Sequence, residues 1–269
     1  MKLGFIGTGN LASAIVRGVA SAGKIPTDEI LIFDLNSEKT EALKAQLGVR
    51  TAQSAKEVAA KCENVVIAVK PKDFAALARD ISGEVMANNP LVISTAAGTE
   101  ISSIVSYFGF DAKVVRIMPN INAAVGEAMT AFCASDSVSQ SEKDFAAEFC
   151  SYFGKAVALE EKYFSAFTAI AGSAPAFAFI FADALTDAGI KYGLPASTAQ
   201  DIAAQMLLGS AKLVLESPLS VSELIRNVCS PAGTTIEGVC SLKESGFENA
   251  VITAIDKTVE KDRRMSGKN

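Results

Sequence analysis

Short apolar runs alternate with helical segments over about the first 160 residues, and this alternation constrains the fold more than any other feature of the chain. Two of the runs, residues 65–69 and 90–93, are continuously apolar, as strands buried on both faces are. Strand–helix alternation of this kind produces βαβ units and a parallel sheet. We predict strands at Lys2–Ile6, Ile30–Phe33, Asn64–Val69, Leu91–Ser94, Lys113–Ile117 and Met129–Cys133, with helices at Asn10–Ala22, Ser37–Gln46, Ser54–Lys61 and Lys72–Asp80.

Only helical patterns follow Leu159. Their breaks are predicted at Gly172–Pro175, Gly193–Pro195, Ser217–Pro218, Ser230–Pro231 and Ser245–Gly246. The longest apolar stretch, residues 174–182, is too short to cross a bilayer, so we expect no membrane anchor. Its core is apolar all round and has to be enclosed on every side. In a domain of about a hundred residues a second subunit is the favoured cover, and a central helix of a monomeric bundle is the alternative.

A glycine motif follows the first predicted strand and opens the first predicted helix. It reads Gly7-Thr8-Gly9-Asn10-Leu11-Ala12, in which Gly7 allows the tight turn, Gly9 lets a pyrophosphate approach and Ala12 keeps the helix close to the strand. The free N–H groups of the helix start attract the phosphates. A turn of small residues is the alternative. The strand–turn–helix context favours dinucleotide binding, and therefore an α/β fold with a Rossmann-like domain at 1–160 and an all-helical oligomerisation domain at 161–269.

Asp34 stands at the end of the second predicted strand, at about the spacing of 20 residues expected for the acid that binds the ribose. A carboxylate there accepts a hydrogen bond from a free 2′-hydroxyl and repels a 2′-phosphate, which favours NADH. Asp34 capping the next helix is the alternative, and the neighbouring Asn36, Ser37 and Lys39 leave room for NADPH. The choice between the two cofactors stays open.

Two further segments follow predicted strands and should meet at the same edge of the sheet, where ligands of open α/β sheets bind. They are Ala68-Val69-Lys70-Pro71 and residues 116–120. Lys70 is a candidate proton donor or cofactor contact, or else a solvated lysine at a helix start. Asn120 either binds the nicotinamide region or holds a turn after Pro119.

The sharpest feature of the C-terminal half is residues 227–235, Asn-Val-Cys-Ser-Pro-Ala-Gly-Thr-Thr. Ser230 is predicted as the N-cap of a helix and Pro231 as its first residue. The free N–H groups and the positive end of the helix dipole would bind a carboxylate beside Gly233. An ordinary capped helix is the alternative.

Composition limits the classes of function. The chain has a net charge of −5 and no Lys/Arg-rich block beyond a weak one at residues 261–264, which argues against nucleic acid and anionic membranes as partners. It contains no histidine, which excludes imidazole-based acid–base and metal chemistry. Its five cysteines form no C-x-x-C pair, so we predict no metal site. With no targeting segment at Met1, they indicate reduced thiols and a cytoplasmic location.

Several motifs together strongly resemble the Δ1-pyrroline-5-carboxylate reductase family. The resemblance runs in order from residue 3 to about residue 247, and its most specific part is Ser230–Thr235. It also includes Ile6–Ile15, Ala68–Pro71, Arg116–Asn120, Gly126–Thr130, Gly172–Ala176, Asp187–Gly189 and Gly193–Pro195. The chain departs from the family at Ile121-Asn122, where Thr-Pro is usual, and at Ala174 and Ala232, where glycine is usual.

The resemblance implies reduction of pyrroline-5-carboxylate to proline, the last step of proline synthesis, with NADPH or NADH. It implies that backbone N–H groups of Gly233, Thr234 and Thr235 hold the substrate carboxylate, with Ser230 in the block and Asn227 in the pocket. It places the Thr235 hydroxyl near the ring nitrogen, as the residue that orients the protonated imine. It further implies a dimer formed by the helical domains, often assembled into a decamer.

Three rival functions would require different features of the sequence. A β-hydroxyacid dehydrogenase would need a Lys-x-x-Asn pair on a C-domain helix, and the pair in this chain, Lys61 and Asn64, leads into a strand of the cofactor domain. A reductase of another cyclic imine is harder to exclude, because Ala232 adds a methyl group at the carboxylate site. A dinucleotide sensor would have no use for the Ser230–Thr235 block.

Overall fold

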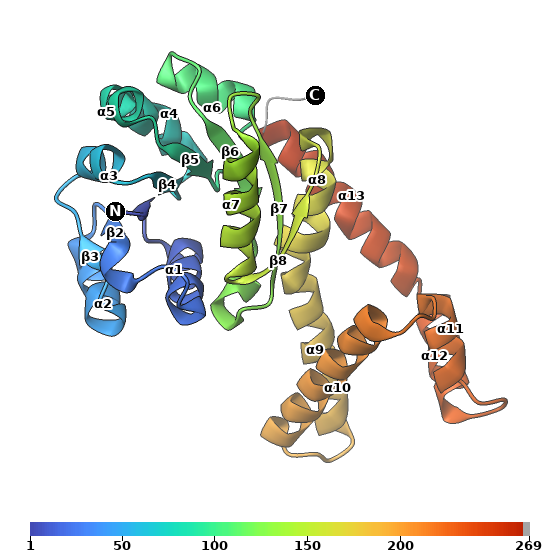
Figure 1. Ribbon diagram of the computed structural model, residues 1–269. Helices are drawn as coiled ribbons and strands as arrows, with labels where there is room; N and C mark the ends of the chain where they lie inside the picture. The colour runs from blue at the N-terminus through green and yellow to red at the C-terminus, as the bar shows by residue number, and fades with distance from the viewer. Residues whose placement is uncertain (266–269) are drawn as a thin grey trace. The chain divides into compact units, whose positions relative to one another are not determined.

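The structure is a computed structural model that describes residues 1–265, and in it the chain forms two compact units (Figure 1). The first comprises Met1–Ser173 together with the end of the last helix from Thr258, and the second comprises Ala174–Lys257. The last four residues of the predicted helical domain, 266–269, lie outside the described part.

The first unit is built on one eight-stranded sheet in the order β3-β2-β1-β4-β5-β6-β7-β8. All neighbouring strands are parallel except β6 and β7, which pair antiparallel. The strands are β1 (Leu3–Ile6), β2 (Ile30–Phe33), β3 (Arg50–Thr51), β4 (Asn64–Ile67), β5 (Leu91–Ser94), β6 (Val114–Met118), β7 (Ala128–Ala134) and β8 (Gly154–Ala158). Strands at all six predicted positions are confirmed, with ends that differ by at most two residues. The two edge strands β3 and β8 were not predicted.

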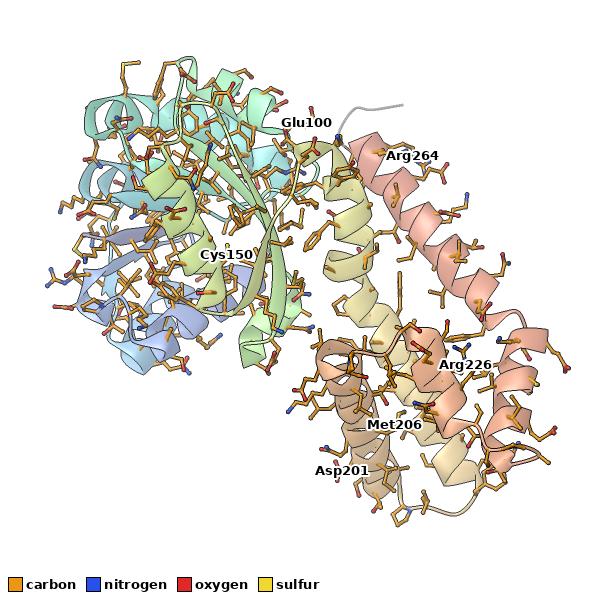
Figure 2. The ribbon with its side chains drawn as sticks, turned by 45° about the vertical axis from the view of Figure 1, so that its right-hand side comes forward. Glu100, Cys150, Asp201, Met206, Arg226 and Arg264 are labelled. Carbon is orange, nitrogen blue, oxygen red and sulfur yellow. The ribbon has the colours of Figure 1, made fainter. Side chains whose placement is uncertain are left out.

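Helices cover both faces of the sheet (Figure 1). The helices α1 (Asn10–Ala22), α2 (Ser37–Leu47) and α7 (Gln140–Ser151) pack on one face, and α3 (Ala55–Lys61), α4 (Pro71–Asp80), α5 (Ser82–Asn88) and α6 (Ile101–Phe108) pack on the other. Cys150 on α7 is buried against the sheet, and burial raises the pKa of its thiol well above the usual value (Figure 2). No disulfide is present among the described residues.

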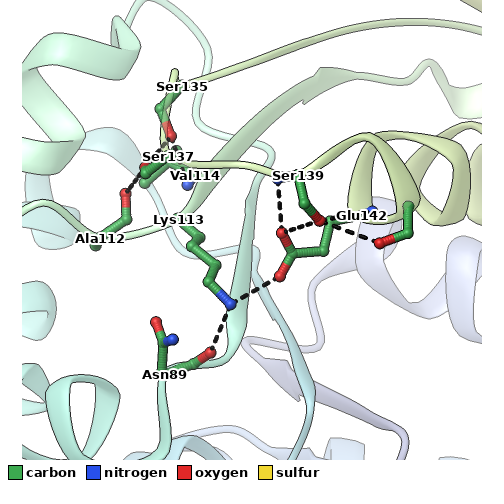
Figure 3. A network of polar contacts seen from close by, with 9 residues as sticks. Asn89, Ala112, Lys113, Val114, Ser135, Ser137, Ser139 and Glu142 are labelled. Atoms are coloured by element: carbon green, nitrogen blue, oxygen red, sulfur yellow. Dashed lines mark hydrogen bonds and ion pairs between the residues drawn. The ribbon is translucent and has the colours of Figure 1, made fainter.

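A polar network ties the antiparallel strand β7 and the helix α7 to the sheet (Figure 3). The Lys113 Nζ donates to Glu142 Oε1 at 2.8 Å and to the Asn89 carbonyl at 3.5 Å. Glu142 also forms a capping box with Ser139 at the start of α7. Burial raises the pKa of Glu142, but the hydrogen bonds from Lys113 and Ser139 outweigh this, so its pKa is lowered.

We expect replacement of Lys113 by methionine to cost about 1 kcal/mol of stability at neutral pH, the upper end for a partly exposed ion pair. The lowered pKa means that Glu142 stabilises the fold above its unfolded-state pKa, and that this contribution disappears as the pH falls through the folded-state value. The difference between wild type and Lys113→Met in urea unfolding should therefore shrink between about pH 7 and about pH 3. An equal difference at both pH values would contradict the ion pair.

The second unit contains α9 (Ala174–Lys191), α10 (Ala196–Glu216), α11 (Val221–Val228), α12 (Thr234–Glu244) and most of α13 (Phe247–Met265). The helices α9 and α10 pack against each other, and Phe181 of α9 contacts Phe247 of α13 with their ring centroids 5.8 Å apart. Figure 2 shows Asp201 and Met206 on α10 and Arg226 on α11. No strand follows Ala158 in the described residues, as predicted.

The predicted helix break at Gly172–Pro175 is wrong. The chain stays helical from Phe164 through α8 (Phe164–Phe167), the π-helical segment η4 (Thr168–Ser173) and α9. The widened π-helical turn accommodates Pro175, which in a regular α-helix would lack its hydrogen bond and collide with the preceding turn. The short 3₁₀ helices are η1 (Thr27–Glu29), η2 (Ile121–Val125) and η3 (Glu161–Tyr163).

The helical stretch Glu161–Lys191 is long and apolar enough to span a membrane by length and composition alone, and only 11% of an apolar 18-residue segment within it is buried inside the chain. The apolar stretch in the sequence analysis, residues 174–182, is shorter because it ends before the first charged residue, Asp183. On α9, Phe179 and Ile180 are 62% and 69% exposed. The chain therefore does not enclose this helix by itself, as expected for a helix that a second subunit covers.

Candidate active site

The glycine motif adopts the conformation that its residue types predict. Gly7 has a φ of +95°, and a Cβ atom there would lie 2.7 Å from the Ala68 carbonyl oxygen, so only glycine fits beside the turn after β4. Gly9 is the N-cap of α1, and no side chain caps the helix. A Cβ atom at Gly9 would meet nothing within 4 Å, so the space before the free N–H groups of α1 is open to a phosphate.

Asp34 follows β2 and is bonded to the glycine motif. Its Oδ2 accepts hydrogen bonds from the Thr8 N–H at 2.7 Å and the Thr8 hydroxyl at 3.0 Å, and its Oδ1 accepts from the Asn36 N–H at 2.9 Å. Burial raises the pKa of Asp34, but these bonds and the charge of Lys39 outweigh burial and lower the pKa. A fixed, ionised carboxylate therefore stands at the end of β2, and Asn36 rather than Asp34 caps α2.

Two residues that support this loop, Thr8 within it and Ser13 in α1, were missed in the sequence. Thr8 is 2% exposed and links the glycine turn to Asp34, and the Ser13 hydroxyl donates to the Thr8 carbonyl at 3.0 Å. The signal was the hydroxyl type of Thr8 between two glycines, with an acid at the end of the second strand. Together these bonds hold the loop rigid.

The segment after β4 lies beside the glycine turn. The Ala68 N–H donates to the Ile6 carbonyl at 2.8 Å, while Val69 packs on the hydrophobic core. Lys70 is exposed and is the N-cap of α4, with Pro71 as the first residue of that helix. The edge of the sheet thus brings together Gly7, Ala68 and Lys70, as parallel strand ends require.

Asn120 follows β6 at the same edge and is 6% exposed. Its Oδ1 accepts from the Asn122 N–H at 3.2 Å and its Nδ2 donates to the Ala171 carbonyl at 2.9 Å. Within the chain, Asn120 therefore makes the contacts of a residue that holds a turn.

In the second unit, Ser230–Gly233 forms a tight turn ahead of α12. The Gly233 N–H donates to the Ser230 carbonyl at 3.1 Å, and a Cβ atom on Gly233 would lie 2.2 Å from the Ser230 Oγ. The predicted helix start is wrong: α12 begins at Thr234, and its N-cap is Gly233 rather than Ser230. The Gly233 N–H is used in closing the turn. In the part of the chain that the structure describes, no side chain caps α12, so its first-turn N–H groups, including those of Thr234 and Thr235, are free.

Ala232 is the third residue of this turn and has a φ of +53°, a left-handed conformation that costs an L-residue about 1–2 kcal/mol. Replacement by glycine removes that strain but adds about 0.4–1 kcal/mol of chain entropy to the unfolded state. We expect Ala232→Gly to stabilise the protein by up to about 1 kcal/mol, measured as a rise in Tm of a few degrees. A lower Tm would contradict the strained turn. Replacement of Gly233 by alanine is the matched variant that should destabilise.

The remaining predicted site residue, Asn227, is exposed in the last turn of α11. Among the described residues no group of His, Cys, Asp and Glu side chains could hold a metal ion.

An eight-stranded, mostly parallel sheet with a glycine turn at the end of β1 defines a dinucleotide-binding oxidoreductase of the Rossmann class. The chain is 36% identical to the pyrroline-5-carboxylate reductase of Escherichia coli strain K12, over 98% of each chain. It is equally similar to that of Aquifex aeolicus, over 98% of this chain and 97% of the relative. The chain belongs to the pyrroline-5-carboxylate reductase family.

Family models and solved structures agree. Residues 161–265 match the model "pyrroline-5-carboxylate reductase dimerisation", and residues 2–98 match "NADP oxidoreductase coenzyme F420-dependent". The chain is similar to the pyrroline carboxylate reductase of Plasmodium falciparum with NADP bound, with a TM-score of 0.90, 29% identity and coverage of 99% and 98%. A pyrroline-5-carboxylate reductase from Coxiella burnetii gives a TM-score of 0.91 at 30% identity, covering 98% of each chain. The dimerisation domain supports the predicted homo-oligomer.

Proposed function

We propose that the protein reduces Δ1-pyrroline-5-carboxylate to L-proline with NADH or NADPH. The observation that carries the proposal is the turn Ser230–Gly233, which leaves the first-turn N–H groups of α12 free in a chain of this family. These donors suit a carboxylate, because backbone N–H groups at a helix start combine hydrogen bonds with the positive end of the helix dipole.

The proposed cofactor-binding residues are at the edge of the sheet in the first unit. We assign the pyrophosphate to the backbone of the glycine motif and the adenosine ribose to the end of β2, with the segment after β4 and the end of β6 beside the nicotinamide half. The open space before Gly9 and the positive φ of Gly7, which only glycine adopts readily, support this assignment. The proposed cofactor-binding residues are Gly7, Gly9, Asn10, Leu11, Asp34, Ala68, Val69, Lys70 and Pro71, while Asn120, the remaining candidate from the sequence, is proposed below to act through the turn that it holds.

The proposed substrate-binding residues are at the start of α12 in the second unit. We assign the substrate carboxylate to the N–H groups of Thr234 and Thr235, while the Gly233 N–H closes the turn and so aims the other two. Ser230 fills the space beside Gly233, and Asn227 completes the pocket. Thr235 and Lys70 are the proposed catalytic residues.

The chemistry demands little beyond placement. A protonated cyclic imine is electrophilic at carbon, so hydride addition to that carbon turns the C=N bond into C–N and leaves a neutral amine, which is then protonated from water. The bound cofactor supplies the hydride. In the proposal the Thr235 hydroxyl accepts the imine N–H and favours the protonated form, and the anchored carboxylate fixes the ring. No imidazole is needed, which agrees with a chain that has no histidine.

We also propose that the protein prefers NADH. The Asp34 carboxylate is held ionised beside the glycine motif by Thr8 and Asn36, and one lone pair of its Oδ1 is left for a ribose hydroxyl. A 2′-phosphate in that place would meet a fixed negative charge.

For the assembly we propose a homodimer that pairs through the apolar helices of residues 161–265 and associates further into a decamer, in the cytoplasm. The exposed apolar side chains of α9 and α10, such as Phe179, Ile180 and Leu213, support pairing by burial.

The proposed reaction is tested by mixing the purified protein with pyrroline-5-carboxylate and following oxidation of NADH and NADPH separately. Δ1-Pyrroline, which lacks the carboxylate, is the matched control substrate. We expect rapid turnover of the first and kcat/KM about 10²-fold lower for the second, because the anchoring charge is missing. Dinucleotide binding without turnover would overturn the proposal in favour of a sensor, and equal rates on both substrates would point to another imine.

A further inference from the structure

The side chain of Asn120 is fixed at both ends of its amide. Its Oδ1 accepts the Asn122 N–H, and its Nδ2 donates to the carbonyl oxygen of Ala171, a residue far along the chain. The side chain is buried, and such an amide keeps one orientation when each end has a partner of the right kind. In this chain the orientation depends on Asn122, because proline, which the family usually has at that position, has no N–H to offer.

Pro175 removes the regular α-helical partner of the Ala171 carbonyl. In a regular α-helix the N–H four residues later donates to each carbonyl, and Pro175 has no N–H to give to Ala171. At this point the helix widens into the π-helical turn η4, and the Asn120 amide donates to the Ala171 carbonyl within that turn. Irregular helical turns of this kind are frequent at functional sites.

The η4 segment lies at the edge of the sheet where the dinucleotide is proposed to bind. Phe164 at its base forms a buried cluster with Met118 at the end of β6. Ala97, which follows β5, and Phe167 pack against this cluster. Gly172 and Ser173 therefore follow directly on a carbonyl that is tied to the strand-end loop after β6. An added Cβ atom on Gly172 would meet only Thr168 at 3.6 Å, so packing within the chain does not demand glycine there.

We propose, on the basis of the function proposed above, that Asn120 is a positioning residue for hydride transfer. By bonding to Ala171 it holds the η4 turn, with Gly172 and Ser173, against the cofactor edge, so that the nicotinamide ring has a fixed wall. Asn120 acts through this turn and not by a contact with the dinucleotide.

The test compares Asn120→Asp with Asn122→Ala. Aspartate keeps the acceptor for the Asn122 N–H but has no hydrogen to donate to Ala171. Asn122→Ala is the matched control, since it removes an amide from the same loop and keeps the backbone N–H that Asn120 uses. Steady-state kinetics with pyrroline-5-carboxylate, the kinetic isotope effect with cofactor deuterated at C4, and hydrogen exchange of the 168–174 amides are measured for each.

We expect kcat to fall by about 10²-fold in Asn120→Asp, since a misplacement of about 1 Å costs that much. The KM for the dinucleotide should change less than about threefold, the isotope effect should rise, and the 168–174 amides should exchange faster. Asn122→Ala should behave as wild type. A second variant, Pro175→Ala, supplies the missing N–H and favours a regular α-helix, so kcat should fall while Tm stays the same or rises.

Three results would overturn the assignment. An unchanged kcat in Asn120→Asp would show that the bond to Ala171 is irrelevant to transfer. A loss confined to dinucleotide affinity would make Asn120 a direct cofactor contact. Unchanged exchange of the 168–174 amides would show that Asn120 does not hold η4. Wild-type protein that fails to reduce pyrroline-5-carboxylate would defeat the proposed function instead, and the exchange experiment would still test the bond.

Discussion

Replacement of Thr235 by alanine is expected to lower kcat/KM for pyrroline-5-carboxylate by about 10²–10³-fold, the usual effect of removing one donor or acceptor at a reacting centre. Thr235 is the second residue of α12, half-buried, and its hydroxyl makes no hydrogen bond with another described residue. The side chain therefore contributes little to the helix start, and its loss should leave Tm within about 2 °C of wild type.

Two variants make this result specific. Thr235→Ser keeps the hydroxyl and should retain most of the activity. Thr234→Ala removes the neighbouring exposed hydroxyl and keeps both backbone N–H groups, so it should change kcat/KM less than about fivefold. If Thr235→Ala and Thr234→Ala had equal and small effects, the hydroxyl of Thr235 would have no role at the imine nitrogen.

The second large effect is expected at Asp34. Asp34→Asn keeps the shape of the side chain and removes its charge, so the ratio of kcat/KM for NADPH to that for NADH should rise by about 10–100-fold. An amide cannot accept from both the Thr8 N–H and the Asn36 N–H, so one of these bonds is lost. We therefore also expect a fall in stability of about 1 kcal/mol.

Thr8→Val is the control that separates the charge of Asp34 from its role in holding the loop. It removes the hydroxyl bond to Asp34 and keeps both the backbone N–H and the carboxylate. The protein should lose stability but keep the cofactor preference of the wild type. A wild-type preference for NADPH, or a ratio that does not move in Asp34→Asn, would contradict the proposed role of Asp34.

The sheet could be predicted because its strands are buried on both faces. Continuous apolar runs, as in β4 and β5, predict strands that are buried on both faces. Each run is followed by a helix, which returns the chain to the end of the sheet where the next parallel strand begins. The two edge strands could not be predicted, because neither has a clear apolar pattern. β3 has only two residues, and β8 is only partly buried. The antiparallel pairing of β7 with β6 was not predicted either. The apolar pattern of a strand does not show its direction, and β8, which pairs parallel with β7, was itself not predicted.

The candidate site was predicted by residue type, but its internal bonds were not. Gly7 and Asp34 stand where the motif requires, while the bond from Asp34 to Thr8 depends on side-chain packing. At Ser230–Gly233 the residue types predict a capped helix, whereas the structure has a tight turn ahead of the helix. The turn has a positive φ at Ala232, and an alanine in the sequence does not indicate that backbone conformation.

The most direct test of the account follows the transferred hydrogen. The protein is incubated with pyrroline-5-carboxylate and with NADH that carries deuterium at C4 of the nicotinamide, separately in each of its two stereochemical forms. We predict that deuterium from one form alone appears in L-proline, on the ring carbon beside the nitrogen and away from the carboxylate. Proline without deuterium from either form, or no proline at all, would contradict direct hydride transfer to the imine and with it the proposed function.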